Sequence, residues 1–216
     1  MKDIVFFDLD GTLTDSGDGI KNSAAYALNK FGIPVPKRDE LNKFIGPPLV
    51  GSFRNLFGMS DEDADLAVVY YREYYAVKGI FENSLYDGVT DMLEALKKAG
   101  RTIVLATSKP EIYANQILKY FNIYDYFTHV CGAEMDHKRT DKHEVIEYAL
   151  ETAGVTDRSR VVMVGDRLHD IQGAKKSHLD SIGVTFGYGS EAELKEAGAD
   201  YIVNDAKELT ELLLKL

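Results

Sequence analysis

Two aspartates stand two residues apart near the start of the chain, in residues 8–12 (DLDGT). The four apolar residues before them, 4–7, predict a strand buried on both faces. Because side chains alternate along a strand, Asp8 and Asp10 point the same way, and neighbouring carboxylates there resist ionisation. The pair is typical either of a turn at Asp10 or of a site where the acids bind a cation or do chemistry.

A second acidic pair follows another apolar run far along the chain. Residues 161–164 are apolar, and residues 165–170 (GDRLHD) come directly after them. Asp166 and Asp170 are four apart, so a helix that begins here would place them on one face. The alternative is a helix cap at Asp166 and a surface acid at Asp170. Two junctions between a buried strand and an aspartate favour a shared site.

A third junction carries hydroxyl groups. Apolar residues 103–106 lead into Thr107 and Ser108, with Lys109 and Pro110 next. Proline at a first helical position with Ser or Thr ahead of it predicts a helix over 110–121. The N–H groups at such a helix start suit a phosphate oxygen, and Thr107 adds a hydroxyl donor. The alternative is that one hydroxyl is a plain N-cap. The sequence does not show whether Lys109 faces the helical segment between residues 15 and 83.

A lysine opens a later helix. Lys142 lies in the first turn of the helix predicted over 142–153, where the helix dipole favours acids. This mismatch indicates a task other than helix stability. Lys138 and Arg139 are nearby alternatives.

Strand and helix patterns alternate from residue 86 to the end. We expect strands over 102–106, 127–131, 161–164, 180–184 and 200–203, with helices over 88–99, 110–121, 142–153, 167–176, 190–197 and 205–215. This alternation predicts right-handed βαβ units, that is, an α/β fold with a Rossmann-like parallel sheet sandwiched by helices. Sites in such sheets lie at the carboxyl ends of the strands, where Asp8, Thr107 and Asp166 can converge.

A block of helices interrupts this order after the first strand. Helical patterns cover 21–31, 49–57 and 61–78, and Ser60 is the expected cap of the last. We therefore expect a core domain of residues 1–14 and 84–216, and a small α-helical domain of residues 15–83 inserted into it.

Composition narrows the class of protein. The net charge is −10 and the pI about 5.0, which argues against nucleic-acid and anionic-membrane partners. The single Cys131 cannot form an internal disulfide, so a reducing compartment is expected. We find neither a signal-peptide pattern at the start nor an apolar stretch of membrane-spanning length. These features predict a soluble cytoplasmic protein.

The ordered motifs resemble those of the haloacid dehalogenase-like (HAD) hydrolase superfamily, most closely its phosphoglycolate phosphatase-like branch. That superfamily carries DxDGT after the first strand, a Thr or Ser after a later strand, a Lys, and then GDxxxD. Residues 8–12, Thr107, Lys142 and 165–170 correspond to them in order, so the resemblance covers essentially all 216 residues. It implies that the helical insert is a cap domain of the type placed after the first motif.

The resemblance also implies a reaction and its residues. Asp8 would attack phosphorus and become an aspartyl-phosphate, while Asp10 would protonate the leaving group and then activate water. Thr107, Ser108 and Lys142 would bind the phosphoryl group. Mg²⁺ would be the cofactor. Its ligands would be Asp8, the backbone carbonyl of Asp10, Asp166 and Asp170.

The implied substrate is a small phosphorylated metabolite, namely phosphoglycolate, a 5′-nucleotide or a sugar phosphate, and the protein would be a monomer or homodimer. Lys43, Arg54 and Arg72 are candidates in the insert for reading the leaving group. A sugar phosphomutase of the same superfamily shares every motif. A non-enzymatic receiver-type domain that binds Mg²⁺ and phosphate is disfavoured by the DxD pair and the insert, and a metal-free dehalogenase by the additional aspartates.

Overall fold

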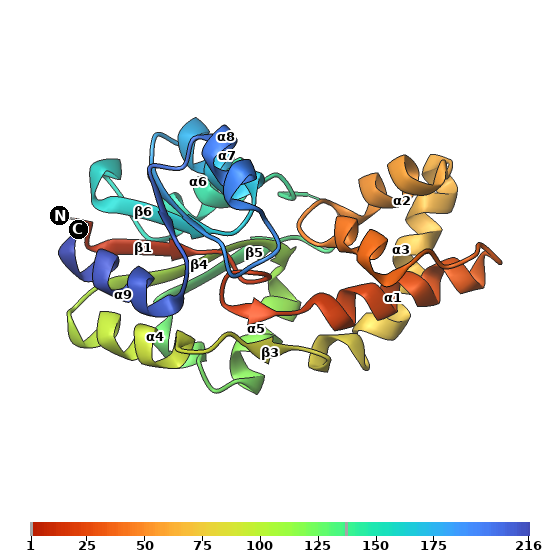
Figure 1. Cartoon of the computed structure of the whole chain (residues 1–216), viewed down its shortest axis with the longest axis horizontal. Coiled ribbons are helices and arrows are strands. Elements are labelled where there is room, and N and C mark those ends of the chain that lie inside the picture. Colours follow the sequence, from red (N-terminus) through yellow and green to blue (C-terminus); the bar gives the residue numbers. More distant parts are fainter. Residues whose placement is uncertain (1, 137) are drawn as a thin grey trace. The chain divides into compact units, whose positions relative to one another are not determined.

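The computed structural model describes residues 2–136 and 138–216. These residues form two compact units, one of residues 2–14 and 85–216 and the other of residues 15–84 (Figure 1). The division and the expected domain boundary differ only in the placement of Ser84.

The first unit is built on a parallel sheet with the strand order β5-β4-β1-β6-β7-β8. Each neighbouring pair of strands runs parallel. The strands are β1 (Ile4–Phe7), β4 (Thr102–Pro110), β5 (His129–Ala133), β6 (Val161–Gly165), β7 (Asp180–Val184) and β8 (Tyr201–Val203). The α/β fold with a Rossmann-like parallel sheet is therefore confirmed.

Helices cover both faces of this sheet (Figure 1). They are α4 (Val89–Lys98), α5 (Glu111–Tyr120), α6 (Lys142–Thr152), α7 (Leu168–Lys176), α8 (Glu191–Ala197) and α9 (Ala206–Lys215). Helices α6 and α7 lie on one face, and α4, α5 and α9 lie on the other. None of the helices in the described part of the chain combines the length and the apolar character needed to cross a membrane.

The central strand β1 is buried on both faces, as its apolar run predicts. Ile4 and Phe6 belong to a core cluster that includes Met163 of β6 and Ile146 of α6. Side chains alternate along a strand, so Val5 and Phe7 point to the opposite face of the sheet. With apolar contacts on both sides, the strand is held firmly, and so is the chain that leaves its carboxyl end.

The register of the central strands sets which residues meet at that end. Phe7 of β1 is paired with Leu105 of β4 on one side and with Val164 of β6 on the other. The next residues in all three strands therefore reach the same edge of the sheet. This edge is where Asp8, Thr107 and Asp166 were expected to converge.

Strand β4 differs from the expectation. It was predicted to end at residue 106 with a helix from Pro110, but it continues to Pro110, and α5 begins at Glu111. Pro110 has φ −53° and ψ 129°, an extended conformation, so it precedes the helix instead of opening it. A bulge lies between Thr107 and Pro110. The expectation that Thr107 stands at a helix start is therefore wrong, because three extended residues separate it from α5.

The other element boundaries differ by a few residues. The strand expected over 127–131 lies at His129–Ala133, and the helix expected over 167–176 begins at Leu168. In the second unit, the helix expected over 21–31 begins at Gly17, and that expected over 61–78 ends at Tyr75.

The second unit is helical, as predicted. It contains α1 (Gly17–Lys30), α2 (Leu49–Phe57), α3 (Asp61–Tyr75) and the 3₁₀ segments η1 (Arg38–Phe44) and η2 (Gly79–Phe81). Ser60 caps α3 by accepting a hydrogen bond from the Asp63 N–H, 3.1 Å away. Two short paired strands, β2 (Thr14–Asp15) and β3 (Ser84–Leu85), lie where the chain passes between the units, and the sequence did not predict them.

A close backbone approach packs α1 against η2. A Cβ atom added to Gly19 of α1 would lie 1.9 Å from the carbonyl oxygen of Gly79 in η2. Only glycine permits this contact, so α1 and η2 pack backbone against backbone. Gly51 of α2 has no atom within 4 Å of its added Cβ.

These two glycines provide a matched pair for testing the second unit. We expect Gly19→Ala to lower the free energy of unfolding by about 1–3 kcal/mol, because the new methyl group overpacks the contact. We expect Gly51→Ala to raise it by about 0.5–1 kcal/mol, because alanine favours the helix at an open position. Denaturant unfolding of both variants measures the difference, and equal effects would contradict the packing described.

Candidate active site

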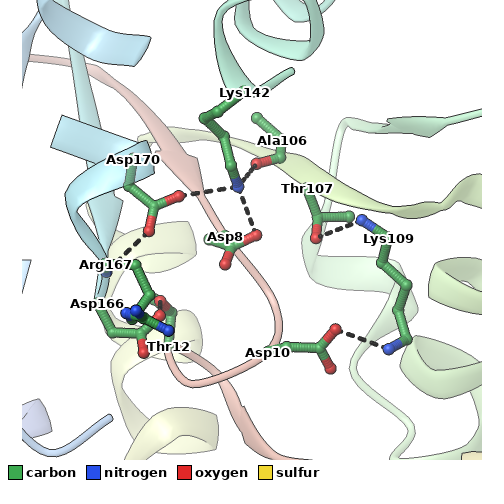
Figure 2. Close-up of polar contacts among 10 residues, drawn as sticks. All are labelled: Asp8, Asp10, Thr12, Ala106, Thr107, Lys109, Lys142, Asp166, Arg167 and Asp170. Carbon is green, nitrogen blue, oxygen red and sulfur yellow. Dashed lines mark hydrogen bonds and ion pairs between the residues drawn. The ribbon is translucent and has the colours of Figure 1, made fainter. Parts of the chain in front are cut away.

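Three buried carboxylates gather at the carboxyl edge of the sheet. Asp8, Asp166 and Asp170 each offer a carboxylate oxygen, and these oxygens lie within 4.8 Å of one another (Figure 2). Asp8 follows β1, and its N–H donates to the carbonyl of Val164, 2.9 Å away. The two acidic motifs of the sequence therefore meet in one cluster.

Asp166 and Asp170 reach this cluster from different positions around the start of α7. The helix begins at Leu168 with Arg167 as its N-cap, so Asp166 precedes it. Asp170 is in the first turn, and its Oδ2 accepts the N–H of Arg167 at 3.0 Å. Neither sequence interpretation holds in full, because Asp166 is not the cap and the two acids do not share a helix face.

The Asp166 side chain is closely surrounded by two hydrogen-bond donors and by the backbone of two glycines. The Thr12 hydroxyl donates to its Oδ1 at 3.3 Å, and the Tyr188 N–H donates to its Oδ2 at 2.8 Å. Added Cβ atoms at Gly11 and Gly187 would lie 2.2 Å and 2.5 Å from atoms of this side chain. Sequence reasoning missed the loop after β7, although its two glycines around an aromatic residue at 187–189 were a visible signal.

Lys142 joins two of the three acids. Its Nζ donates to Asp8 Oδ1 at 2.7 Å and to the carbonyl of Ala106 at 3.1 Å, and it pairs with Asp170 Oδ1 at 2.8 Å (Figure 2). The alternatives lie elsewhere. Lys138 pairs with Asp136, and Arg139 pairs with Glu134.

Burial dominates the electrostatics of the cluster. It raises the pKa of Asp8 to about 6, with the Lys142 charge opposing the increase and the Asp170 charge adding to it. The pKa of Asp166 is raised well above its usual range by burial and by the charges of Asp170 and Asp8. Burial alone would lower the pKa of Lys142, but the two neighbouring acids raise it.

Asp10, the fourth aspartate near the site, forms an ion pair with a different lysine, Lys109. Asp10 Oδ2 accepts from Lys109 Nζ at 2.6 Å, and the Lys109 side chain is only 6% exposed. The sequence did not predict that Lys109 pairs with Asp10. Its position two residues after Thr107 was a weak signal, because nothing else in the sequence distinguishes it from the other lysines.

The two hydroxyl residues predicted to bind phosphate, Thr107 and Ser108, differ in burial. Thr107 is buried, and its Oγ1 accepts the N–H of Lys109 at 3.3 Å. Ser108 is half-buried.

The charges of these residues suit a divalent cation. Four carboxylates (Asp8, Asp10, Asp166 and Asp170) and two ammonium groups (Lys109 and Lys142) leave a formal charge of −2. The oxygens are the hard donors that such cations prefer in proteins. The donor set, its burial and the raised acid pKa values therefore fit a bound cation, whose charge would relieve the repulsion.

Comparisons with known proteins extend these observations. Residues 5–184 match the family described as haloacid dehalogenase-like hydrolase. The chain is 40% identical over 209 residues to a 5′-nucleotidase of Pseudomonas aeruginosa, covering 97% of this chain and 94% of that one. It is equally identical to the tyrosine-protein kinase PtkA of Mycobacterium tuberculosis, covering 97% and 70%. A phosphoglycolate phosphatase of Agrobacterium fabrum is 30% identical, covering 98% and 92%.

A solved structure gives the same picture. The crystal structure of a predicted phosphatase from Clostridium acetobutylicum is 47% identical, covers all of both chains and superposes with a TM-score of 0.97. The sequence motifs, the parallel sheet and these matches agree. The chain belongs to the haloacid dehalogenase-like hydrolase family, in its phosphoglycolate phosphatase-like branch.

Proposed function

We propose that this phosphoric monoester hydrolase uses Mg²⁺ and an aspartyl-phosphate intermediate to dephosphorylate a small phosphorylated metabolite. The observation that carries the proposal is the Asp8 carboxylate, which lies within 2.7 Å of the Lys142 ammonium and beside Asp166 and Asp170. A nucleophile, a fixed cation and a metal-binding pair of acids are thereby combined at one strand end.

Asp8 is the nucleophile of this proposal. Burial raises its pKa, while the Lys142 ammonium 2.7 Å away favours the ionised form that attack on phosphorus requires. A bond forms between an Asp8 oxygen and phosphorus while the ester P–O bond breaks. The Lys142 ammonium neutralises charge on the Asp8 side of the transferring group.

Asp10 transfers a proton both when the leaving group departs and when water attacks the intermediate. It donates a proton to the departing ester oxygen, so the product leaves as an alcohol. It then takes a proton from the water that attacks the phosphorus of the aspartyl-phosphate, which releases inorganic phosphate and restores Asp8. Donation and acceptance balance over one turnover.

The remaining residues orient the phosphoryl group. The Thr107 hydroxyl accepts the Lys109 N–H, so its own proton can be directed to a phosphoryl oxygen. Ser108 assists. Asp8, Asp166, Asp170 and the backbone carbonyl of Asp10 would hold Mg²⁺. When bound, the ion supplies positive charge to the phosphoryl oxygens.

The names of the relatives guide the substrate assignment. Relatives named 5′-nucleotidase and phosphoglycolate phosphatase favour small phosphate esters, whereas the relative named a tyrosine-protein kinase would pass the phosphoryl group to another acceptor. A sugar phosphomutase would return it to sugar. A panel of phosphorylated metabolites, assayed for free phosphate and for sugar-phosphate isomers, separates these reactions, and a tyrosine-containing protein tests the kinase reaction.

We further propose that the helical unit of residues 15–84 acts as a cap that selects the leaving group. Arg54 lies in this unit on α2, and its side chain is 52% exposed and ion-paired with Asp61. A cap of this kind would exclude water on closing and admit substrate on opening. The chemistry would remain with the first unit.

Asp8→Asn tests the nucleophile. The substitution keeps the shape of the side chain but removes its charge, so we expect kcat to fall by at least about 10³-fold. Asp125→Asn, at an exposed aspartate, is the control and should retain full activity. Both are measured by phosphate release with p-nitrophenyl phosphate. Substantial activity in Asp8→Asn would show that another group attacks phosphorus.

Mg²⁺ binding has a readout that is independent of activity. An ion at one hundred times its Kd stabilises the native state by about 2.7 kcal/mol, which corresponds to a rise in Tm of about 5–10 °C at this size. We expect the rise in the wild type and in Asp125→Asn, and its loss in Asp166→Asn. EDTA should abolish turnover in the wild type. Equal Tm values with Mg²⁺ and with EDTA in the wild type would rule out the assigned metal site.

The cap proposal predicts a change in substrate ranking. We expect Arg54→Ala to reduce kcat/KM for the preferred metabolite by about 10-fold and to leave acetyl phosphate nearly unchanged, because so small a substrate offers little to recognise. Arg160→Ala is the matched control, since Arg160 is also 52% exposed and paired with an aspartate, in the first unit. A uniform effect of Arg54→Ala on all substrates would argue against selection by Arg54.

A further inference from the structure

The second buried lysine of the site is not used by the mechanism above. Lys109 is 9% exposed as a residue, and its Nζ lies 2.6 Å from Asp10 Oδ2 (Figure 2). We infer that Lys109 is a positioning residue that fixes the Asp10 carboxylate for proton transfer to and from the reacting oxygens. The inference rests on the proposed function, because it concerns the role given there to Asp10.

The two oxygens of Asp10 have different surroundings. Oδ2 is bound by Lys109, whereas Oδ1 is shielded from solvent and has no hydrogen-bond partner within the described residues. A buried carboxylate oxygen without a partner is costly, and such atoms concentrate at sites that do chemistry. The arrangement therefore leaves Oδ1 as the atom that can exchange a proton with an ester oxygen or a water.

Lys109 can hold Asp10 because its own backbone is fixed. Its N–H donates to Thr107 Oγ1, and it lies in the bulge of β4 between Thr107 and Pro110. Strand β5 runs so close to this bulge that a Cβ atom on Gly132 would lie 2.7 Å from the Lys109 carbonyl oxygen. The sheet thus fixes the backbone from which the Lys109 side chain extends to Asp10.

The same bulge connects the proposed phosphoryl-binding residue with the residue that positions Asp10. Thr107, which we assign to the phosphoryl group, and Lys109, which binds Asp10, are joined by one hydrogen bond. The distance between the phosphoryl site and the proton-transfer group is therefore set within three residues of one strand. Proton transfer requires hydrogen-bond reach, so a carboxylate that rotates away loses rate without losing substrate affinity.

The leaving group provides the first test. An alkyl ester needs a proton on its departing oxygen, whereas p-nitrophenolate leaves readily without one. For Lys109→Met, we expect kcat/KM to fall about 30-fold with phosphoglycolate, within the range that general acid catalysis contributes, and less than about 3-fold with p-nitrophenyl phosphate. Lys98→Met is the control, because Lys98 is an exposed lysine paired with Glu94. It removes the same charge and should change neither value.

A double-mutant cycle provides the second test. If Lys109 acts through Asp10, Lys109→Met should cost less than about 3-fold in the Asp10→Asn background, because the group that it positions is already lost. The cycle is measured with p-nitrophenyl phosphate as kcat, which includes the hydrolysis step that Asp10 also assists. We expect KM for p-nitrophenyl phosphate to fall together with kcat in Lys109→Met, because slower hydrolysis of the intermediate lowers both while kcat/KM changes little.

The outcomes separate this inference from the proposed function. An equal loss on both esters, or additive losses in the cycle, would show that Lys109 acts on the phosphoryl group itself and would overturn the inference. Activity that survives Asp8→Asn would instead overturn the proposed function. Tm values for each variant verify folding, and Lys109→Gln, which retains a polar side chain, replaces Lys109→Met if the latter fails to fold.

Discussion

The site depends on the contact between the Lys142 ammonium and the Asp8 carboxylate. Asp8 is buried at the end of a strand with apolar packing on both faces, and burial raises its pKa to about 6. Without a cation within 2.7 Å, the acid would be still harder to ionise there. Lys142 also reaches Asp170 and the Ala106 carbonyl, so one ammonium connects strands β1 and β4 with helix α7. Glycine at position 173 permits this, because a Cβ there would lie 2.8 Å from Cγ of Lys142.

A second constraint comes from the register of the parallel sheet. Pairing of Phe7 with Leu105 and Val164 fixes where the chain emerges from each of the three central strands. The functional side chains therefore lie close to the strand ends, on short backbone segments with little freedom to move. Asp8 follows its strand directly, Asp166 is cradled by Gly11 and Gly187, and Lys109 lies in a bulge packed against Gly132. Glycines at these positions give the backbone the close approach that the carboxylates and the lysine require.

The sequence predicted the fold and much of the candidate site for a physical reason. Buried parallel strands read as uninterrupted apolar runs, so the strand ends and the acids after them are visible without a structure. The misplaced start of α5 shows the limit, because Pro110 is compatible with a helix start locally but is held extended as β4 continues beside β5. Lys109 and Tyr188 were missed because their roles arise from contacts with residues 99 and 22 positions away. The local signals, two glycines around Tyr188 and the place of Lys109 two residues after Thr107, do not name the distant partner.

The two lysines pair with three of the four acids of the site. Lys142 comes from a helix start and binds Asp8 and Asp170, whereas Lys109 comes from a strand bulge and binds Asp10. If one lysine served all three of these acids, any movement that aided the proposed proton transfer would also disturb the proposed nucleophile. Separate anchors on α6 and β4 allow Asp10 to be tuned to the leaving group while Asp8 stays fixed. In the proposed mechanism, bond formation and proton transfer would thus be supported from different elements of the same sheet edge.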